Sequence, residues 1–369
     1  MNHVVWHTSS HQPPESGKPG WVYYAGTHIT PNITWWPMAR PFLDYLARAS
    51  FLLRQGIPVS DVLHYYGDQG YNFVTPKHVD PSLGYGFDYD VTNADALLRR
   101  MNSKNGRITL PEDGSYSLLT LPDRTDMDLD VLRKLATLVK QGATVVGRKP
   151  KRSTGYSGYP DRDRLVQELA GRLWGVSSAS SGEHPFGKGR VIWGRPLRQI
   201  LTGMNIKPDL QFSNHQSDLD FVQRRLIKED TDIYFLRNKS NKWLEGEAKF
   251  RITGRQPEIW LADSGSIEPL TNYAIDSDGT RVKAWNPPDR SSSYSATRRR
   301  SRNLPLPLSP SKPSPSVVPG TCISQRTWAR RPQPLSQLSP PEPITKSKEL
   351  SITQASPNTI SKSPCPTDG

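Results

Sequence analysis

Cysteine is scarce in this sequence. The chain of 369 residues has two, Cys322 and Cys365, and both lie near its C-terminal end. The residues before Cys322 therefore offer no disulfide, no thiolate ligand for a metal and no cysteine nucleophile. Thiol chemistry is therefore excluded before Cys322, and disulfides cannot be used to infer whether the protein works in an oxidising or a reducing compartment.

Long apolar runs are also missing. Hydrophobic residues make up 34% of the chain, and no stretch approaches the roughly 18 apolar residues that cross a bilayer. The opening residues, MNHVVWHTSSHQPP, lack the basic and apolar stretches of a secretory signal peptide. We therefore expect no membrane partner, and the localisation stays unknown.

Proline, by contrast, is abundant, with 34 residues. The run NLPLPLSPSKPSPSVVPG is typical of the chain after residue 285. A segment rich in Pro, Ser, Arg and Lys buries too little apolar surface to offset its chain entropy. We predict that residues 286–369 form a disordered tail.

The charge of the chain divides at the same point. Residues 286–369 contain 12 Lys and Arg against 4 Asp and Glu, a net charge of +8, whereas the whole chain carries +13. Basic segments bind nucleic acid or anionic lipid through counterion release. Because this tail has no nucleic-acid module, we interpret it as solvated and expect no specific nucleic-acid partner.

The first part of the folded region indicates alternating strands and a helix. Residues 4–6 are typical of a short strand. Apolar residues recur at helical spacing from Phe42 to Leu53, ahead of Gly56 as a C-cap. The run DVLHYYG at 61–67 predicts a further strand. This order indicates a βαβ unit with parallel strands.

The pattern continues and then changes its period. Helices are predicted at 93–101, 128–142 and 163–175, and strands at 116–123, 143–147 and 189–194, which together indicate a doubly wound α/β domain. From about residue 230 the apolar period becomes two, as in TDIYFLRNKS, which predicts antiparallel strands. These strands stop near Val282, so we expect an incomplete β-sandwich.

Two runs resemble nucleotide and calcium sites without fitting them. GEHPFGKGR at 182–190 has glycine where a P-loop has Ser or Thr, and it precedes a strand instead of following one. DMDLD at 126–130 lacks the later glycine and glutamate of an EF-hand loop. We interpret its acids as caps of the following helix and predict no metal site.

Histidine and tryptophan supply the candidate contacts. His7 and His11 have the spacing of a zinc protease without its glutamate, so ligand contact and hydrogen bonding within the loop both stay open. Trp35 and Trp36 precede the helix. Aromatic faces bind sugars, but a hydrophobic plug is the interpretation that we favour for at least one of the pair.

Several runs resemble the α-L-rhamnosidases of glycoside hydrolase family 106. They follow one another from residue 1 to about 282 and include HTSSHQP, GTHITPNITWWPMARPFLDYLARASFLLRQG, YDVTNADALLRR, GRITLPEDGSYSLLTLPDRTDM, GKGRVIWGRPL and FRITGRQPEIW. The resemblance implies an α/β fold class: 1–75 as the end of a catalytic (β/α)8 barrel, 76–200 as a flavodoxin-like domain similar to class I glutamine amidotransferases, 201–285 as a partial β-sandwich, and 286–369 as the tail.

The resemblance also implies a loss. Family members are longer, so we expect this chain to be their C-terminal portion, truncated upstream. They look like inverting hydrolases, which need two carboxyl groups roughly 6.5–9.5 Å apart. Both carboxyl groups and the calcium ligands are expected upstream, and none of Asp44, Asp61 and Asp68 matches a catalytic position. Without cysteine, the amidotransferase-like domain is excluded from amidotransferase chemistry.

We therefore expect a rhamnosidase-like chain that has no catalytic residue or cofactor of its own and is inactive alone. Its candidate substrate-binding residues are His7, His11, His28, Trp35 and Trp36, and its expected partner is a rhamnose-containing glycoside or polysaccharide. The alternative is a non-catalytic carbohydrate-binding or interaction protein derived from the same family. The abrupt loss of strand pattern after residue 282 favours an out-of-frame tail.

Overall fold

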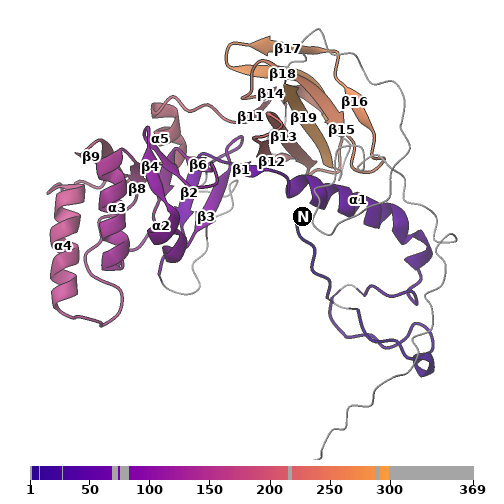
Figure 1. The fold of residues 1–369 in the computed structure, drawn as a ribbon, viewed down its shortest axis with the longest axis horizontal. Helices are drawn as coiled ribbons and strands as arrows, with labels where there is room; N and C mark the ends of the chain where they lie inside the picture. The colour runs from indigo at the N-terminus through magenta and orange to yellow at the C-terminus, as the bar shows by residue number, and fades with distance from the viewer. Residues whose placement is uncertain are drawn as a thin grey trace, which may run out of the picture. The chain divides into compact units, whose positions relative to one another are not determined.

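The computed structural model describes residues 2–7, 9–26, 28–68, 74, 83–214, 218–286 and 291–298, and for residues 284–286 and 291–298 it describes the backbone alone. These residues form a mainly parallel six-stranded sheet, two antiparallel sheets and a small three-stranded sheet (Figure 1). Among the described helices, none is long and apolar enough to cross a membrane. Both cysteines and the predicted tail beyond residue 298 lie outside the described residues.

The mainly parallel sheet has the strand order β3-β2-β7-β8-β10-β9, and only β9 runs antiparallel to its neighbour. Numbered along the chain, its parallel strands lie in the order 2-1-3-4-5, which is the order of flavodoxin-like doubly wound sheets. The strands are β2 (Val62–Tyr65), β3 (Tyr89–Thr92), β7 (Leu118–Thr120), β8 (Thr144–Val146), β9 (Gly182–Phe186) and β10 (Gly189–Trp193).

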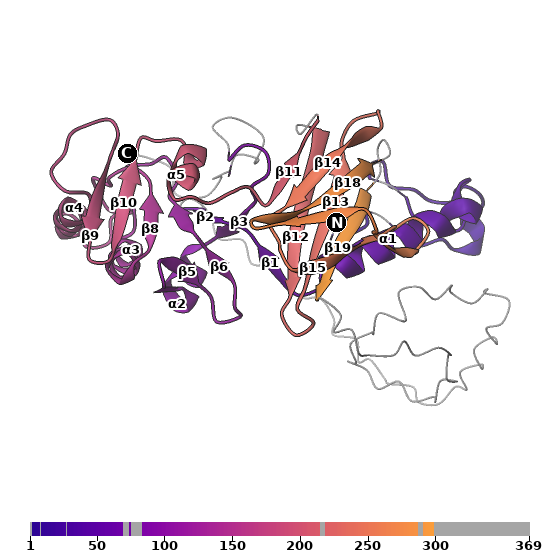
Figure 2. The same ribbon diagram turned by 90° about the horizontal axis from the view of Figure 1, so that it is seen from above.

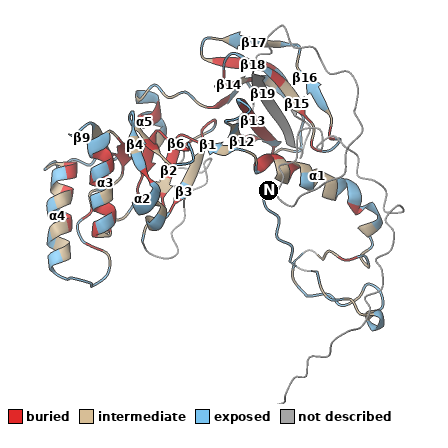
Figure 3. Ribbon diagram, viewed as in Figure 1, coloured by how far each residue is buried: buried red, intermediate tan, exposed pale blue. Residues whose placement is uncertain are grey.

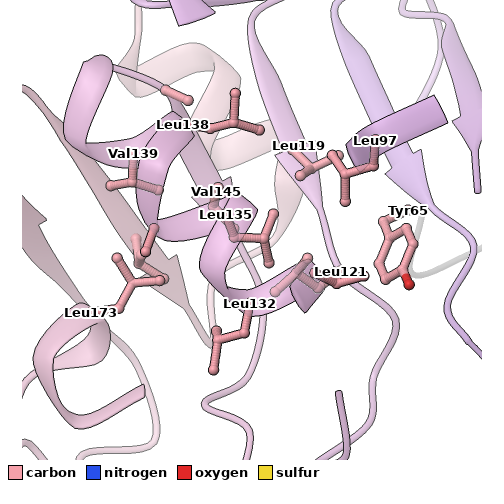
Figure 4. Close-up of a cluster of buried hydrophobic side chains, with 14 of the residues drawn as sticks. Tyr65, Leu97, Leu119, Leu121, Leu132, Leu135, Leu138, Val139, Val145 and Leu173 are labelled. Carbon is pink, nitrogen blue, oxygen red and sulfur yellow. The ribbon is translucent and has the colours of Figure 1, made fainter. Parts of the chain in front are cut away.

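Each face of this sheet has its own core, because successive residues of a strand point to opposite faces. One core is formed with helices α2 (Ala94–Arg100), α3 (Leu129–Gln141) and α4 (Asp161–Trp174), and Figure 4 shows α3 pointing its leucines at Leu119 and Val145. The opposite core is formed with α5 (Leu197–Gly203). Figure 2 shows α3 and α5 on opposite sides of the sheet.

Helix α3 shows why the sequence folds in this way. The Asp128 carboxylate accepts hydrogen bonds from the backbone N–H groups of Asp130 (2.8 Å) and Val131 (3.3 Å), so it caps the first turn. This confirms the interpretation of the DMDLD acids as helix caps for Asp128, with Asp130 as an acid of the first turn, whereas Asp126 accepts from the Arg124 guanidinium (3.0 Å). At the other end, Gly142 adopts a φ of 129° that other residues avoid, and the helix stops there, as predicted.

The two antiparallel sheets pack their inner faces together around a shared core. One sheet has the order β1-β12-β13-β19-β15-β16 and the other the order β11-β14-β18-β17. Their strands are β1 (Ile57–Val59), β11 (Leu210–Phe212), β12 (Leu219–Leu226), β13 (Thr231–Asn238), β14 (Leu244–Phe250), β15 (Arg255–Trp260), β16 (Ile267–Pro269), β17 (Tyr273–Asp276), β18 (Gly279–Asn286) and β19 (Ser291–Arg298). The small sheet contains β4 (Asn102–Lys104), β5 (Arg107–Thr109) and β6 (Ser115–Tyr116).

Strand β19 corrects the predicted start of the tail. The sequence predicted that the strands stop near Val282 and that disorder begins at residue 286, yet β18 continues to Asn286 and β19 covers Ser291–Arg298. Strand β19 pairs with β13 on one side and β15 on the other. The sequence of β19 lacks alternating apolar residues. The prediction failed because this strand is defined by backbone pairing with distant strands, which leaves no local pattern.

The predicted βαβ unit at the start of the chain is also wrong. Residues 4–6 form no strand, and helix α1 (Ala39–Leu53) buries Leu52 against Ile233 and Trp260 of the antiparallel sheet. The predicted strand at 61–67 contains β2, which pairs with β3 and β7, so the predicted boundary at residue 75 cuts through the parallel sheet.

Gly56 has a role other than the predicted helix cap, since α1 ends before it. A Cβ on this residue would lie 2.1 Å from the carbonyl oxygen of Arg225. Only glycine fits this close approach of the chain to β12, next to the point where β1 begins to pair with it.

Candidate functional site

The predicted histidines lie on two neighbouring loops that precede α1. The Ser9 hydroxyl donates to the carbonyl of Ile29 (3.0 Å), and a Cβ on Gly26 would lie 1.7 Å from the carbonyl oxygen of His7. These contacts bring the loop with His7 against the loop with His28. The side chains of His7 and His11 are exposed and that of His28 is half-buried.

A run of aromatic residues lies beside the same loops. The Gln12 side-chain amide donates to the carbonyl of Trp21 (2.6 Å), and its oxygen accepts from the Trp21 N–H (3.0 Å). The ring of Tyr23 packs edge-on against the imidazole of His7, with the ring centroids 5.3 Å apart. Trp21 and Tyr24 are 58% and 89% exposed. No residue of the run WVYY was among the candidate contacts predicted from the sequence.

Trp35 and Trp36 lie at the start of α1, where Trp36 opens the short 3-10 turn Trp36–Met38. Their ring centroids are 6.5 Å apart, the rings are tilted by 52°, and both side chains are half-buried. A half-buried indole packs with one part and presents another to solvent. Both predicted roles, plug and sugar contact, therefore fit this pair. Among the described residues, neither ring stacks on a histidine.

Carboxyl groups are few next to these aromatic residues. Between residues 2 and 56, the acids among the described residues are Glu15 and Asp44. Asp44 is paired with Arg40, whose Nε lies 3.1 Å from the carboxylate. Figure 3 shows that most of the chain before α1 is exposed or half-exposed. This segment therefore offers aromatic and imidazole surfaces to a ligand without a pair of facing carboxyl groups.

The other two acids singled out from the sequence stabilise the fold. Asp61 is buried, and it accepts hydrogen bonds from the Ser117 hydroxyl (2.9 Å) and the Arg251 guanidinium (2.7 Å). Asp68 accepts from the Tyr65 hydroxyl and from the Asp128 N–H (2.9 Å), and burial raises the pKa of its carboxyl group. Within the described ranges, no group of three His, Cys, Asp or Glu side chains could hold a metal ion.

The family model of glycoside hydrolase family 106, described as α-L-rhamnosidase, matches residues 1–275. The chain belongs to the α-L-rhamnosidase family. A solved rhamnosidase from Novosphingobium sp. PP1Y is 31% identical to this rhamnosidase-family chain, with a TM-score of 0.71. A curated protein of Formosa agariphila, named "Putative beta-glucuronidase", is 34% identical over 283 residues.

These relatives are much longer than this rhamnosidase-family chain. The match covers 85% of this chain and 29% of the solved rhamnosidase. It covers 76% of this chain and 23% of the Formosa protein. The chain therefore spans about a quarter of the length of either relative.

Proposed function

We propose that this chain is the C-terminal portion of an α-L-rhamnosidase-like glycoside hydrolase, which binds terminal α-L-rhamnosides but does not hydrolyse them alone. The similarity to the solved rhamnosidase over 85% of the chain is the observation that carries the proposal. In this proposal, residues 1–56 of the chain are the end of the catalytic (β/α)8 barrel. Residues 62–203 are the flavodoxin-like domain, similar to class I glutamine amidotransferases, and residues 210–298 are a β-sandwich.

The described side chains support binding better than hydrolysis. The exposed faces of Trp21 and Tyr24 and the half-buried Trp pair suit the apolar face of a sugar ring. The imidazoles of His7, His11 and His28 can donate to or accept from its hydroxyl groups. Hydrolysis with inversion needs one carboxylic acid to protonate the leaving oxygen and one carboxylate to activate water. In our proposal, these groups and the calcium ligands belong to the part of the enzyme upstream of this chain.

The first test measures hydrolysis. We expect the purified full chain to release no rhamnose from an aryl α-L-rhamnoside above a buffer blank, while a full-length rhamnosidase in the same assay does so. Release above the blank that follows the chain through purification would refute the claim of inactivity.

The second test measures binding. Replacing Trp35 or Trp36 by alanine removes an aromatic face, so we expect each variant to bind an aryl α-L-rhamnoside about fivefold more weakly, the loss of roughly 1 kcal/mol typical of such contacts. Trp243→Ala is the matched control, because Trp243 is an exposed tryptophan in the loop before β14. An equal loss in all three variants, or no binding by the parent chain, contradicts the proposed sugar-facing role.

A non-catalytic carbohydrate-binding protein of the same family is the second candidate. It is favoured by the same observation, exposed aromatic residues without facing carboxyl groups. The two candidates differ when the chain is mixed with a polypeptide carrying the remaining part of a family member. A gain of rhamnosidase activity supports the enzyme portion, and unchanged binding without any gain supports the non-catalytic protein.

A further inference from the structure

A polar cavity of about 540 Å³ lies where the residues before β2 meet β12 and the segment that leads into β11. None of its lining residues belongs to residues 2–56, which contain the histidines and aromatic residues described above. Its volume falls within the range of roughly 300–1,000 Å³ that is usual for small-molecule sites. Its lining consists mostly of charged and amide side chains, with Val59 and Ile206 as apolar members.

Two buried oxygen atoms in its lining have no hydrogen-bond donor among the residues that the structure describes. Asp209 is 1% exposed, and its Oδ1 accepts from Arg251 while its Oδ2 has no partner. Gln223 is 2% exposed, and its amide nitrogen donates to Asp232 (3.0 Å) while its Oε1 has no partner. Buried polar atoms are almost always satisfied. These two residues come from different elements and line the same cavity, so a ligand there can supply both missing donors.

Cationic side chains line the same cavity. Arg225 binds Asp232 through its Nε (2.9 Å), which is one of the five N–H donors of a guanidinium. Arg107 and Lys207 also line the cavity. Arg107 donates to the hydroxyls of Ser115 (3.1 Å) and Ser117 (2.7 Å). The cavity therefore offers donors from cationic groups next to buried acceptors.

This combination selects the class of ligand. The lining carries four cationic side chains, Arg107, Lys207, Arg225 and Arg251, against three carboxyl groups, Asp61, Asp209 and Asp278, so its net charge does not favour a cation. A fully deprotonated inorganic anion has only acceptors, so it would leave Asp209 Oδ2 and Gln223 Oε1 unsatisfied. A hydroxyl group donates one hydrogen bond and accepts two, so neighbouring hydroxyls can satisfy the acceptors and the arginines together. We propose that this cavity binds one neutral polyhydroxylated molecule the size of a monosaccharide, as a second site that uses hydrogen bonds instead of aromatic stacking.

The test is calorimetric titration at about pH 8.5 of the full chain carrying Trp35→Ala and Trp36→Ala, which removes the Trp pair from the measurement. At this pH Asp209, whose pKa is raised to about 7, is ionised and accepts hydrogen bonds. The probes are methyl α-L-rhamnoside, methyl β-D-glucoside and methyl β-D-glucuronide; the last two differ by one carboxylate. We expect a neutral glycoside to bind, and the glucoside to bind at least about tenfold more tightly than the glucuronide. No binding of either neutral probe, or tighter binding of the glucuronide, overturns the proposal.

Variants of the cavity locate the binding. Asp209→Asn keeps the shape and replaces one acceptor oxygen by a donor, so we expect about tenfold weaker binding, as for the loss of one hydrogen bond to a charged group. Arg225→Gln is the second variant, because this partly exposed side chain can be changed if Asp209→Asn fails to fold. Asp123→Asn, at an exposed carboxylate, is the control. Binding that is unchanged in a folded Asp209→Asn or Arg225→Gln chain overturns the assignment.

Discussion

One guanidinium serves two buried carboxyl groups in this protein. Arg251 donates through the same nitrogen to Asp61 (2.7 Å) and to Asp209. Burial is the largest cause that raises the pKa of Asp209, to about 7, and the nearby Asp61 carboxylate adds to it, against the opposing effect of Arg251. The folded chain therefore keeps a proton on Asp209 over a pH range in which the unfolded chain has released it.

The raised pKa of Asp209 predicts that the folded chain loses stability as the pH rises. The pKa of the Asp209 carboxyl group is 3.8 in the unfolded chain and about 7 in the folded chain. Between these two pH values the folded state binds more protons than the unfolded state. The contribution of Asp209 to the free energy of unfolding therefore falls as the pH rises from about 4 to about 7. The upper limit of the loss is about 4 kcal/mol. Urea unfolding at pH 5 and pH 8 measures it, and Asp209→Asn should reduce the difference between the two. An unchanged difference in the variant contradicts the assignment.

His64 on β2 predicts the opposite dependence. Burial lowers the pKa of this imidazole from 6.5 to about 4, so the folded state resists protonation that the unfolded state accepts. Stability from this group is present above pH 6.5 and is lost as the pH falls towards 4, by roughly 3 kcal/mol at most. His64→Gln should unfold less readily on acidification from pH 7 to pH 4.5 than the parent chain. Equal acid sensitivity of the two proteins would show that another group is responsible.

Among the elements, α1 is held by its C-terminal half. Leu52 packs against Ile233 and Trp260, whereas Phe42 near the other end is 48% exposed. We expect Leu52→Ala to reduce the free energy of unfolding by about 2–5 kcal/mol and Phe42→Ala to cost much less. Thermal and urea unfolding of both variants measure the difference. Equal effects would mean that α1 is not anchored on the antiparallel sheet.

Strand β19 predicts where the chain can be shortened. A chain that ends at residue 286 lacks this strand, so β13 and β15 lose the backbone partner between them and expose unpaired strand edges. We expect this chain to aggregate or to lose part of its antiparallel sheet. A chain that ends at residue 298 keeps β19 and is the matched control. Circular dichroism and gel filtration compare them; identical behaviour would contradict the position of β19 in the sheet and favour the out-of-frame interpretation.

The secondary structure of the run GEHPFGKGR shows that it is not a P-loop. It forms β9 and the start of β10, and the two strands pair antiparallel across the turn at 187–188. The structure therefore agrees with the sequence argument that this run does not open a helix, as a P-loop must.

For the whole molecule, Arg251 is the link between distant parts of the chain. It joins Asp61, next to the parallel sheet, with Asp209, which precedes β11. Replacing it with Met leaves two buried carboxyl groups without a cation. We expect Arg251→Met to cost about 3–5 kcal/mol and to separate the unfolding of the parallel sheet from that of the antiparallel sheets. Calorimetry of this variant against Arg237→Met, at an exposed arginine, measures both effects. A single unchanged transition would contradict the linking role.

The sequence by itself determined what depends on neighbouring residues. The sequence predicted the apolar period and the caps of α3, the helix α4, the strand β10 and the buried strands β7 and β8, because each element buries a face that its own local pattern defines. The family resemblance was also predicted from the sequence, and the family match over residues 1–275 confirms it. Within the candidate site, the histidines and Trp35 and Trp36 were predicted, and the exposed run WVYY was not.

Tertiary structure decided what depends on distant partners. The position of α1, the sheet to which β2 belongs and the existence of β19 follow from pairing between segments far apart in the chain. The cavity has the same origin, since Asp61 and Arg251 are 190 residues apart and Gln223 and Asp209 come from different elements. No local period records such contacts, because backbone pairing and ion pairs between distant residues form only when the chain has folded.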